Sequence, residues 1–266
     1  MLPGPRRTSF SSITRAAWLA GIVLLLSPVD QLANEIRGNV DGGSVVCREE
    51  LSVARREELA TKLQKISGLT DLKFDDDGIL RLAGNRTAGG SQSARELLAN
   101  ASNGRNVVVL EDASNRSDVA FCRVIPGRWK TTAANSRPVF VVQIDFADFD
   151  KVVGDERALE AFNVGWGLLH ELDHIVDDSN DATTLDETGD CETHINQMRR
   201  ECNLPERADY FFTLSPLAAN TVFMTHLVRL AFEEQKPATN KKKRYWLIWD
   251  ANMVGGIEHS QIAALR

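Results

Sequence analysis

The sequence has no excess of basic residues. Lysine and arginine total 31 against 37 aspartates and glutamates, which leaves a net charge of −6 at pH 7. An acidic protein is repelled by a phosphate backbone, so binding to nucleic acid is not the expected main role. The one basic run, Lys241–Arg244, precedes the apolar stretch YWLIWD and is expected to be a solvated loop leading into a strand. We therefore predict no nucleic-acid partner.

A membrane-spanning apolar run is also missing. The apolar segment AAWLAGIVLLL covers only residues 16–26, whereas a spanning helix needs about 20 residues. It follows Arg6, Arg7 and Arg15, and a basic segment before an apolar segment of this length is typical of a secretory signal. No A-x-A cleavage sequence follows, so an uncleaved anchor that associates with a membrane through residues 16–26 stays open. We expect residues 1–45 to be a signal peptide or membrane anchor with a linker.

This N-terminus predicts an exported protein that is secreted, periplasmic or membrane-anchored. The alternative is a cytoplasmic protein with a buried N-terminal helix. The four cysteines do not decide between the two compartments. Cys191 and Cys202 are expected on one helix, where a rise of 1.5 Å per residue separates them by about 16 Å, beyond disulfide reach. Cys47 and Cys122 are the more plausible pair if the protein is exported.

The sequence has no internal repeat and no low-complexity tract, and its periodicities divide it into two parts. Residues 46–155 are expected to hold a small mixed sheet, and residues 156–266 are expected to be mainly helical. Helices are expected at 49–66, 93–101, 159–176, 191–202 and 215–235, and strands within 72–82, 106–111, 118–125, 138–146 and 245–250. This order predicts an α+β fold.

The stretch LLHELDHIVDD at 168–178 carries the chemistry. His170 and His174 are four residues apart, so a helix places both imidazoles on one face, where they can bind one metal ion. Glu171 projects to the side of that face, where it can remove a proton from a water molecule activated by the ion. H-E-x-x-H is the signature of zinc metallopeptidases. The structural alternative is a helix with two histidines satisfied by hydrogen bonds.

A catalytic zinc usually has three protein ligands. Glu192 lies 18 residues after His174, in the first turn of the next expected helix, and Glu187 is an alternative. Here the sequence resembles the gluzincin group of zincin metallopeptidases, in which a helix one loop after H-E-x-x-H carries a glutamate ligand. The resemblance covers residues 166–196. It implies His170, His174 and Glu192 as zinc ligands, Glu171 as the base, and Asn196 as a residue that supports a histidine.

Two other readings of the motif remain open. HELDHI also resembles the H-E-x-D-H stretch of peptide deformylases, which would make Cys122, four residues before Pro126, the third ligand. That family's glycine-rich first motif is absent here. Alternatively, Cys191 and His194 could complete a closed, non-catalytic zinc site with the two motif histidines, as in a zinc-stabilised binding domain.

Zincins commonly hold the oxyanion of the reaction with a downstream histidine or tyrosine. Tyr210 is our first candidate for this role, because it closely follows the expected ligand helix, and His226 and Tyr245 are others. The sequence thus predicts a zincin-like α+β domain over residues 46–266 in which the sheet packs on the motif helix. We expect a Zn²⁺-dependent peptidase that acts on a peptide or protein substrate through Glu171.

Overall fold

The computed structural model describes residues 44–83, 89–127, 137–184, 187–210, 212–214, 227–236, 241–255 and 262–263. Within these ranges no helix is long and apolar enough to cross a membrane. The predicted signal or anchor segment, residues 16–26, lies outside the described residues and stays a prediction. The described part combines helices with small sheets, and this agrees with the expected α+β class.

The first sheet has four strands in the order β1-β4-β6-β5. The first three strands of that order are mutually parallel, and the last is antiparallel to its neighbour and forms an edge. Their bounds are β1 Ser44–Cys47, β4 Val107–Asp112, β5 Cys122–Pro126 and β6 Val139–Ile144. A short hairpin, β2 Lys73–Phe74 with β3 Leu80–Arg81, lies between β1 and β4 in the chain, as the Asp-Gly turn predicts.

Two helices follow β1 and precede β4, and both have clear start signals. Helix α2, Val53–Ser67, begins where the side chain of Ser52 accepts a hydrogen bond from the amide of Arg55, and it ends at Gly68 with φ of 73°. Helix α3, Gln92–Asn103, begins at Ser91, whose hydroxyl accepts from the amide of Ala94. Serine at the first position and a left-handed glycine after the last are favourable ends for a helix.

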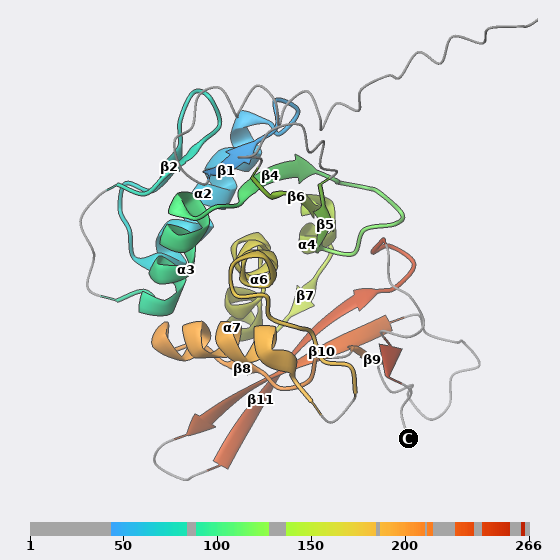
Figure 1. Cartoon of the computed structure of the whole chain (residues 1–266). Coiled ribbons are helices and arrows are strands. Elements are labelled where there is room, and N and C mark those ends of the chain that lie inside the picture. Colours follow the sequence, from blue (N-terminus) through green and yellow to red (C-terminus); the bar gives the residue numbers. More distant parts are fainter. Residues whose placement is uncertain are drawn as a thin grey trace, which may run out of the picture.

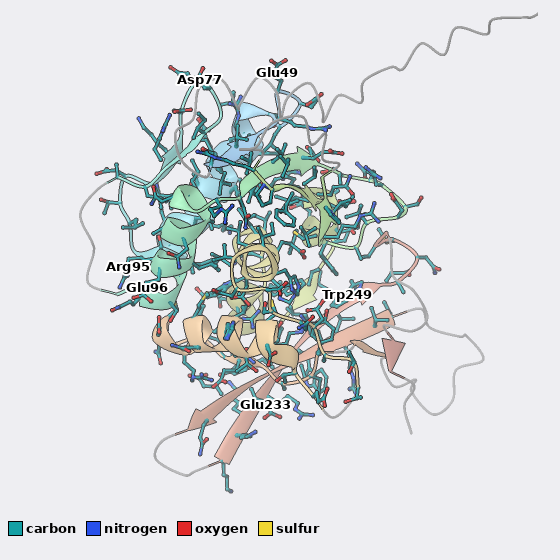
Figure 2. All side chains as sticks on the ribbon, viewed as in Figure 1. Glu49, Asp77, Arg95, Glu96, Glu233 and Trp249 are labelled. Carbon is teal, nitrogen blue, oxygen red and sulfur yellow. The ribbon has the colours of Figure 1, made fainter. Side chains whose placement is uncertain are left out.

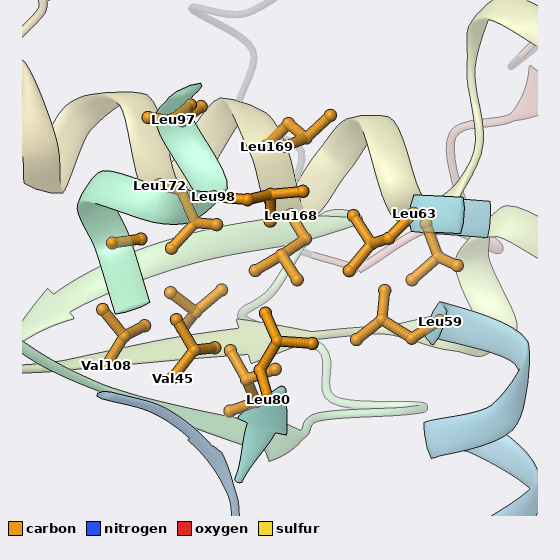
Figure 3. Packing of buried hydrophobic residues seen from close by; sticks show 14 of the residues in the cluster. Val45, Leu59, Leu63, Leu80, Leu97, Leu98, Val108, Leu168, Leu169 and Leu172 are labelled. Atoms are coloured by element: carbon orange, nitrogen blue, oxygen red, sulfur yellow. The ribbon is translucent and has the colours of Figure 1, made fainter. Parts of the chain in front are cut away.

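Helix α6, Val164–Val176, carries the motif and lies at the centre of the molecule (Figure 1). It contacts α2, α3, β5 and β6, and also α7, Gly189–Glu201. Leu168, Leu169 and Leu172 of α6 meet leucines of α2 and α3 and valines of the sheet in one core (Figure 3). All three leucines are fully buried. The motif helix is therefore held from several sides, which gives its polar face a fixed orientation.

The helix through the motif is shorter than expected, and the reason is Asn163. Residues 159–176 form two helices, α5 Glu156–Ala161 and α6, because the side chain of Asn163 accepts a hydrogen bond from the amide of Gly165 and starts a new helix. Asparagine favours this first position over a helix interior. Two short elements, α4 Phe146–Asp150 and β7 Val153–Gly154, precede α5.

The expectation of a mainly helical C-terminal part is wrong for the described residues. The last nine residues of the helix expected at 215–235 belong to strand β10, Leu227–Lys236, and residues 215–226 lie outside the described ranges. Strand β10 pairs with β11, Lys241–Asp250, as a long antiparallel hairpin that lies below α7 in Figure 1. The remaining described strands are β8 Glu206–Arg207, β9 Phe212–Leu214 and β12 Ile262–Ala263.

Burial in the hairpin explains the error. Val228, Leu230 and Phe232 alternate along β10 and are buried in a second hydrophobic cluster with Leu247 and Trp249 of β11. The apolar run around them fits both a helix and a strand by periodicity, so the distant pairing decides. The basic run at 241–244 is exposed, as expected, but lies within β11 and not in a loop.

The suggested disulfide between Cys47 and Cys122 does not form, and all four cysteines are free thiols. Cys47 is on β1 and Cys122 is on β5, at opposite edges of the first sheet. Strands are spaced about 4.8 Å apart, so three steps across the sheet exceed the reach of a disulfide.

Candidate metal centre

Helix α6 places the two motif histidines on one face, as predicted. His170 and His174 are largely buried, and their ring centroids lie 4.8 Å apart. The Nδ1 atom of His174 lies 2.8 Å from the carbonyl oxygen of Ser179. Only a protonated Nδ1 can donate to that carbonyl, so the neutral ring keeps the lone pair of its Nε2 atom for another partner.

Asp181 reaches the same point as these two rings. Its Oδ1 atom lies 3.1 Å from Nε2 of His170 and 3.4 Å from Nε2 of His174. Burial raises the pKa of Asp181, but hydrogen bonds from both imidazoles outweigh this and lower it. Burial lowers the pKa of His174, but Asp181 and the Ser179 carbonyl raise it to about 9. Two nitrogens and one oxygen therefore converge, and together they could hold a cation.

The turn after α6 brings Asp181 back to the histidines. Asp178, two residues beyond the end of the helix, has a positive φ of 53°, and Asp181 forms a bridge to Gly189 at the start of α7. The expected ligands do not include Asp181, because it lies between the helices expected at 159–176 and 191–202 and on neither of them. The sequence signal for Asp181 is a helix that ends soon after its second histidine. The chain then reverses its direction and brings the following residues back to the end of the helix.

Glu192, the expected third ligand, lies on the other side of His170. Its Oε2 atom is 3.7 Å from Nδ1 of His170 and 3.1 Å from Nη1 of Arg207, while its Oε1 atom accepts a hydrogen bond from Arg199. Burial raises the pKa of Glu192, but the two arginines outweigh it and lower the pKa. Among the described residues, Glu192 does not belong to the group of potential ligand atoms that Asp181 forms with the two histidines. This geometry does not favour Glu192 as third ligand, and its role as a ligand stays a prediction.

The two other residues connected with Glu192 also differ from expectation. Glu187, the alternative third ligand, is exposed. Two groups of described side chains are close enough together to hold a metal ion, and Glu187 belongs to neither of them. Within the described ranges, the side chain of Asn196 forms no hydrogen bond to a histidine. Its Oδ1 atom accepts hydrogen bonds of 2.8 Å from Nη1 of Arg199 and from the amide of Arg207. Asn196 therefore joins α7 to β8 and helps to place the two arginines.

Glu171 is buried beside the histidines and faces edge strand β5. Glu171 is 7% exposed, and its carboxylate accepts a hydrogen bond from the amide of Val124. Burial raises the pKa of Glu171, while the two histidines and the Val124 amide act in the opposite direction. A carboxylate with a raised pKa that borders a metal site is suited to accept and return a proton.

The amide of Val124 also shows which side of β5 is open. Strand β5 pairs with β6 through odd-numbered residues, since the amide of Gly127 donates to Val139 and the carbonyl of Phe121 accepts from Asp145. Amide and carbonyl of one residue point the same way in an antiparallel strand. Residues 122, 124 and 126 therefore direct their backbone groups toward the free edge, next to Glu171.

Tyr210, the expected oxyanion donor, does lie at the histidines. Its ring is stacked on His170 at 6.4 Å between centroids, and its hydroxyl donates a hydrogen bond to Asp181. Burial, followed by the charge of Asp181, raises the pKa of Tyr210. Of the two other candidates, Tyr245 donates to Glu234 in the hairpin, and His226 lies outside the described residues.

The cysteine alternatives can also be placed. Cys191 belongs to a group with His170, His174 and Asp181 whose potential ligand atoms all lie within 4.8 Å of one another. Its Sγ atom, however, is 3.3 Å from Nδ1 of His170, on the side of the ring away from Asp181. His194 instead pairs with Asp173 at 3.0 Å.

Cys122 belongs to neither ligand group among the described residues, so the arrangement suggested by the deformylase resemblance is not formed. Its thiol points toward α6, where a Cβ atom placed on Gly167 would lie 2.9 Å from its Sγ. Burial raises the pKa of this thiol.

These side chains border a cavity of about 320 Å³. One wall is apolar and aromatic, with rings of Phe121, Phe149 and Phe162 packed at 5.1 to 5.6 Å between centroids. The other wall carries the polar groups His170, Glu171, His174, Asp181, Glu192, Arg199, Arg207 and Tyr210. A cavity with a few convergent polar groups in an apolar surround is typical of a ligand site.

None of the known protein-family profiles, curated proteins or solved structures matches this chain.

Proposed function

We propose that this protein is a zinc-dependent hydrolase of amide bonds, and specifically a peptidase. His170, His174 and Asp181 are the proposed metal ligands. The observation that carries the proposal is the convergence of the two Nε2 atoms on one carboxylate oxygen. Ligand atoms bound to a tetrahedral zinc lie about 3.3 Å apart. The two Nε2–Oδ1 distances, 3.1 and 3.4 Å, match that spacing.

The hydrogen bonds around the three residues support the same assignment. Histidines that bind zinc usually donate their second ring nitrogen to a carbonyl or a carboxylate, which fixes the ring. Nδ1 of His174 faces the Ser179 carbonyl, and Nδ1 of His170 faces Glu192 at 3.7 Å. In enzymes with the signature H-E-x-x-H-x-x-G-x-x-H, the third ligand also comes from the chain soon after the second histidine. Glu192 then orients a ligand and does not bind the ion itself.

The chemistry divides between the ion and this chain. A bound zinc would supply Lewis acidity and lower the pKa of a water molecule to about 7. Glu171 would take a proton from that water and return it to the leaving amine, because it is buried in the cavity wall and its pKa is raised. The amide of Val124 holds Glu171 in place. The free edge of β5 would bind an extended peptide by strand addition.

The test of this function is Glu171→Gln. We expect the variant to keep its zinc, since the ligands are intact, and to lose about 10²- to 10⁴-fold in kcat on a peptide library. Glu156→Gln, which changes an exposed glutamate at the start of α5, is the matched control and should hydrolyse at the parent rate. Full activity in Glu171→Gln would sink the proposed mechanism.

The second candidate is a non-catalytic zinc-stabilised domain, and the proximity of Cys191 favours it. If Cys191 binds the ion with His170, His174 and Asp181, the site is closed to water. This reading expects loss of zinc in Cys191→Ser and no hydrolysis by the parent. The peptidase expects Cys191→Ser to keep both zinc and activity.

A further inference from the structure

The floor of the cavity holds an arrangement that the proposed reaction does not use. Glu192 lies between two arginines, with Oε1 bound to Arg199 and Oε2 to Arg207. Glu192 and Arg199 are 1% and 3% exposed, and Arg207 is largely buried. Two guanidinium groups thus share one carboxylate. A buried guanidinium is costly unless its N–H groups are hydrogen-bonded, so a donor of Arg199 that faces the cavity calls for an acceptor there.

Arg199 directs the unused part of this charge into the cavity. Its Nε atom donates to the carbonyl of Ala161, and its Nη1 atom donates to Glu192 and Asn196. Its Nη2 atom forms no hydrogen bond within the described part of the chain, although the residue lines the cavity. The guanidinium is also fixed, because it lies between the rings of Trp166 and Phe232, at 5.3 and 5.4 Å from their centroids.

The other carboxylates of the cavity face different partners. Besides Glu192, the lining contains Glu171, which faces β5, and Asp181, which faces the histidines. Arg123 also lines the cavity, but its Nη2 atom is paired with Asp118 at 2.7 Å. The Nη2 atom of Arg199 therefore remains available to an acceptor in the cavity.

We propose that Arg199 at the cavity floor binds a carboxylate of the substrate, so that the preferred substrates carry a carboxylate on the residue next to the scissile amide. This inference rests on the proposed function for its reaction, but the anion site itself does not depend on hydrolysis. The carboxylate is either a free C-terminus or an acidic side chain. The rings of Phe121 and Phe162 beside the arginine would pack on the apolar atoms of the same residue.

The first arm of the test compares substrates on the parent enzyme. One pair of peptides differs only in a C-terminal acid against a C-terminal amide, with the scissile bond before the last residue. A second pair differs in Glu against Gln beside the scissile bond of a longer amidated peptide. A charge-assisted hydrogen bond at the floor predicts a kcat/KM about 10- to 100-fold higher for the carboxylate member of one pair. Equal rates within both pairs would overturn the inference and leave the peptidase assignment intact.

The second arm measures binding without turnover. The zinc-loaded Glu171→Gln protein is titrated by calorimetry with the acid and amide forms of the same peptides. We expect the carboxylate form to bind about 10- to 100-fold more tightly, and Arg199→Gln in that background to remove the difference. Arg157→Gln, outside the cavity, should keep it. A difference that persists in Arg199→Gln would contradict the inference.

The two arms separate the possible failures. If no peptide is hydrolysed but the acid form still binds through Arg199, the anion site stands and the proposed function falls. If Arg199→Gln does not fold, the acid and amide comparisons on the parent and on Glu171→Gln decide the question. Similar affinities for both forms there would also count against the anion site.

Discussion

At the residue scale, the candidate site is a closed ring of polar contacts. His170 meets Asp181 through Nε2 and Glu192 through Nδ1. Glu192 binds Arg207, which donates to the backbone carbonyl of Tyr210 and lies over its ring, 4.8 Å from the centroid. The hydroxyl of Tyr210 returns to Asp181. Each proposed ligand in this ring is therefore held by a second group, which is the usual condition for a well-ordered metal site.

Glu201, at the end of α7, gives a prediction on pH and stability. Hydrogen bonds from Ser91, Ser93 and Gln197 outweigh burial and lower the pKa of Glu201 to about 2 from an ordinary value of 4.5. A folded-state pKa below the unfolded value stabilises the fold above about pH 4.5, and this contribution is lost as pH falls toward 2. We expect the melting temperature of the parent to fall more steeply over this window than that of Glu201→Gln.

The measurement is a series of melting curves between pH 2 and pH 7 in EDTA, so that release of a metal does not contribute. Glu49→Gln changes an exposed glutamate at the periphery (Figure 2) and should follow the parent. Parallel curves for the parent and Glu201→Gln would show that the hydrogen bonds of Glu201 do not stabilise the fold.

The sequence predicts some residues of the site and misses others for a physical reason. His170, His174 and Glu171 follow from spacing on one helix, and Tyr210 from its place after the next helix. Asp181 depends on a turn with a positive φ at Asp178, which no periodicity reveals. Glu192 was the natural candidate for third ligand because α7 does bring it to His170. Glu192 is paired with Arg199 and Arg207, and the sequence gives no sign of that pairing.

At the scale of elements, edge strand β5 connects the sheet to the site. Its even-numbered backbone groups face outward, and the amide of Val124 binds Glu171. Val124→Pro removes that amide without removing a hydrogen bond to β6. We expect about 10-fold or greater loss of kcat in this variant, with a melting temperature close to that of the parent.

Ile125→Pro is the matched control, because its amide faces β6 and takes part in the ladder. We expect it to lower the melting temperature by several degrees and to reduce the yield of folded protein. If Val124→Pro unfolds the protein as strongly as Ile125→Pro does, the assignment of the open side of β5 is wrong.

Element prediction succeeded where local signals agree with the final packing. Helices α2 and α3 have capping serines, and the strands near 107 and 139 are short apolar runs with β-branched residues. It failed for β10, where LVRLAF permits both a helix and a strand and the paired residues lie 13 to 23 positions further along the chain. The zincin-like arrangement of these elements, which the motif implies, stays a prediction.

At the scale of the whole molecule, the two larger hydrophobic clusters of the described residues have packing neighbours in common. The first surrounds α6, and the second joins the β10–β11 hairpin to α5. Phe149 and Leu204 pack against both clusters. Figure 2 shows Trp249, a member of the second cluster, where the hairpin meets the rest of the protein. Because the clusters are joined, we expect them to unfold together.

Leu247→Ala tests the contribution of the hairpin. Leu247 is fully buried in the second cluster, so its truncation should lower the free energy of unfolding by about 2–5 kcal/mol. Leu227→Ala, at an exposed position of the paired strand, should change it by less than about 0.5 kcal/mol. Denaturant unfolding followed by fluorescence measures both. Two separate transitions, or no effect of Leu247→Ala, would mean that the hairpin is not part of one cooperative fold.

The most direct test of the central claim is the zinc content and zinc affinity of the full chain, measured for the parent, Asp181→Ala and Glu192→Gln. The account predicts one zinc per chain in the parent, loss of stoichiometric zinc in Asp181→Ala, and a zinc that is kept but bound about 10- to 100-fold more weakly in Glu192→Gln. Parent-like zinc binding in Asp181→Ala, together with its loss in Glu192→Gln, would contradict the account and return the third ligand to Glu192.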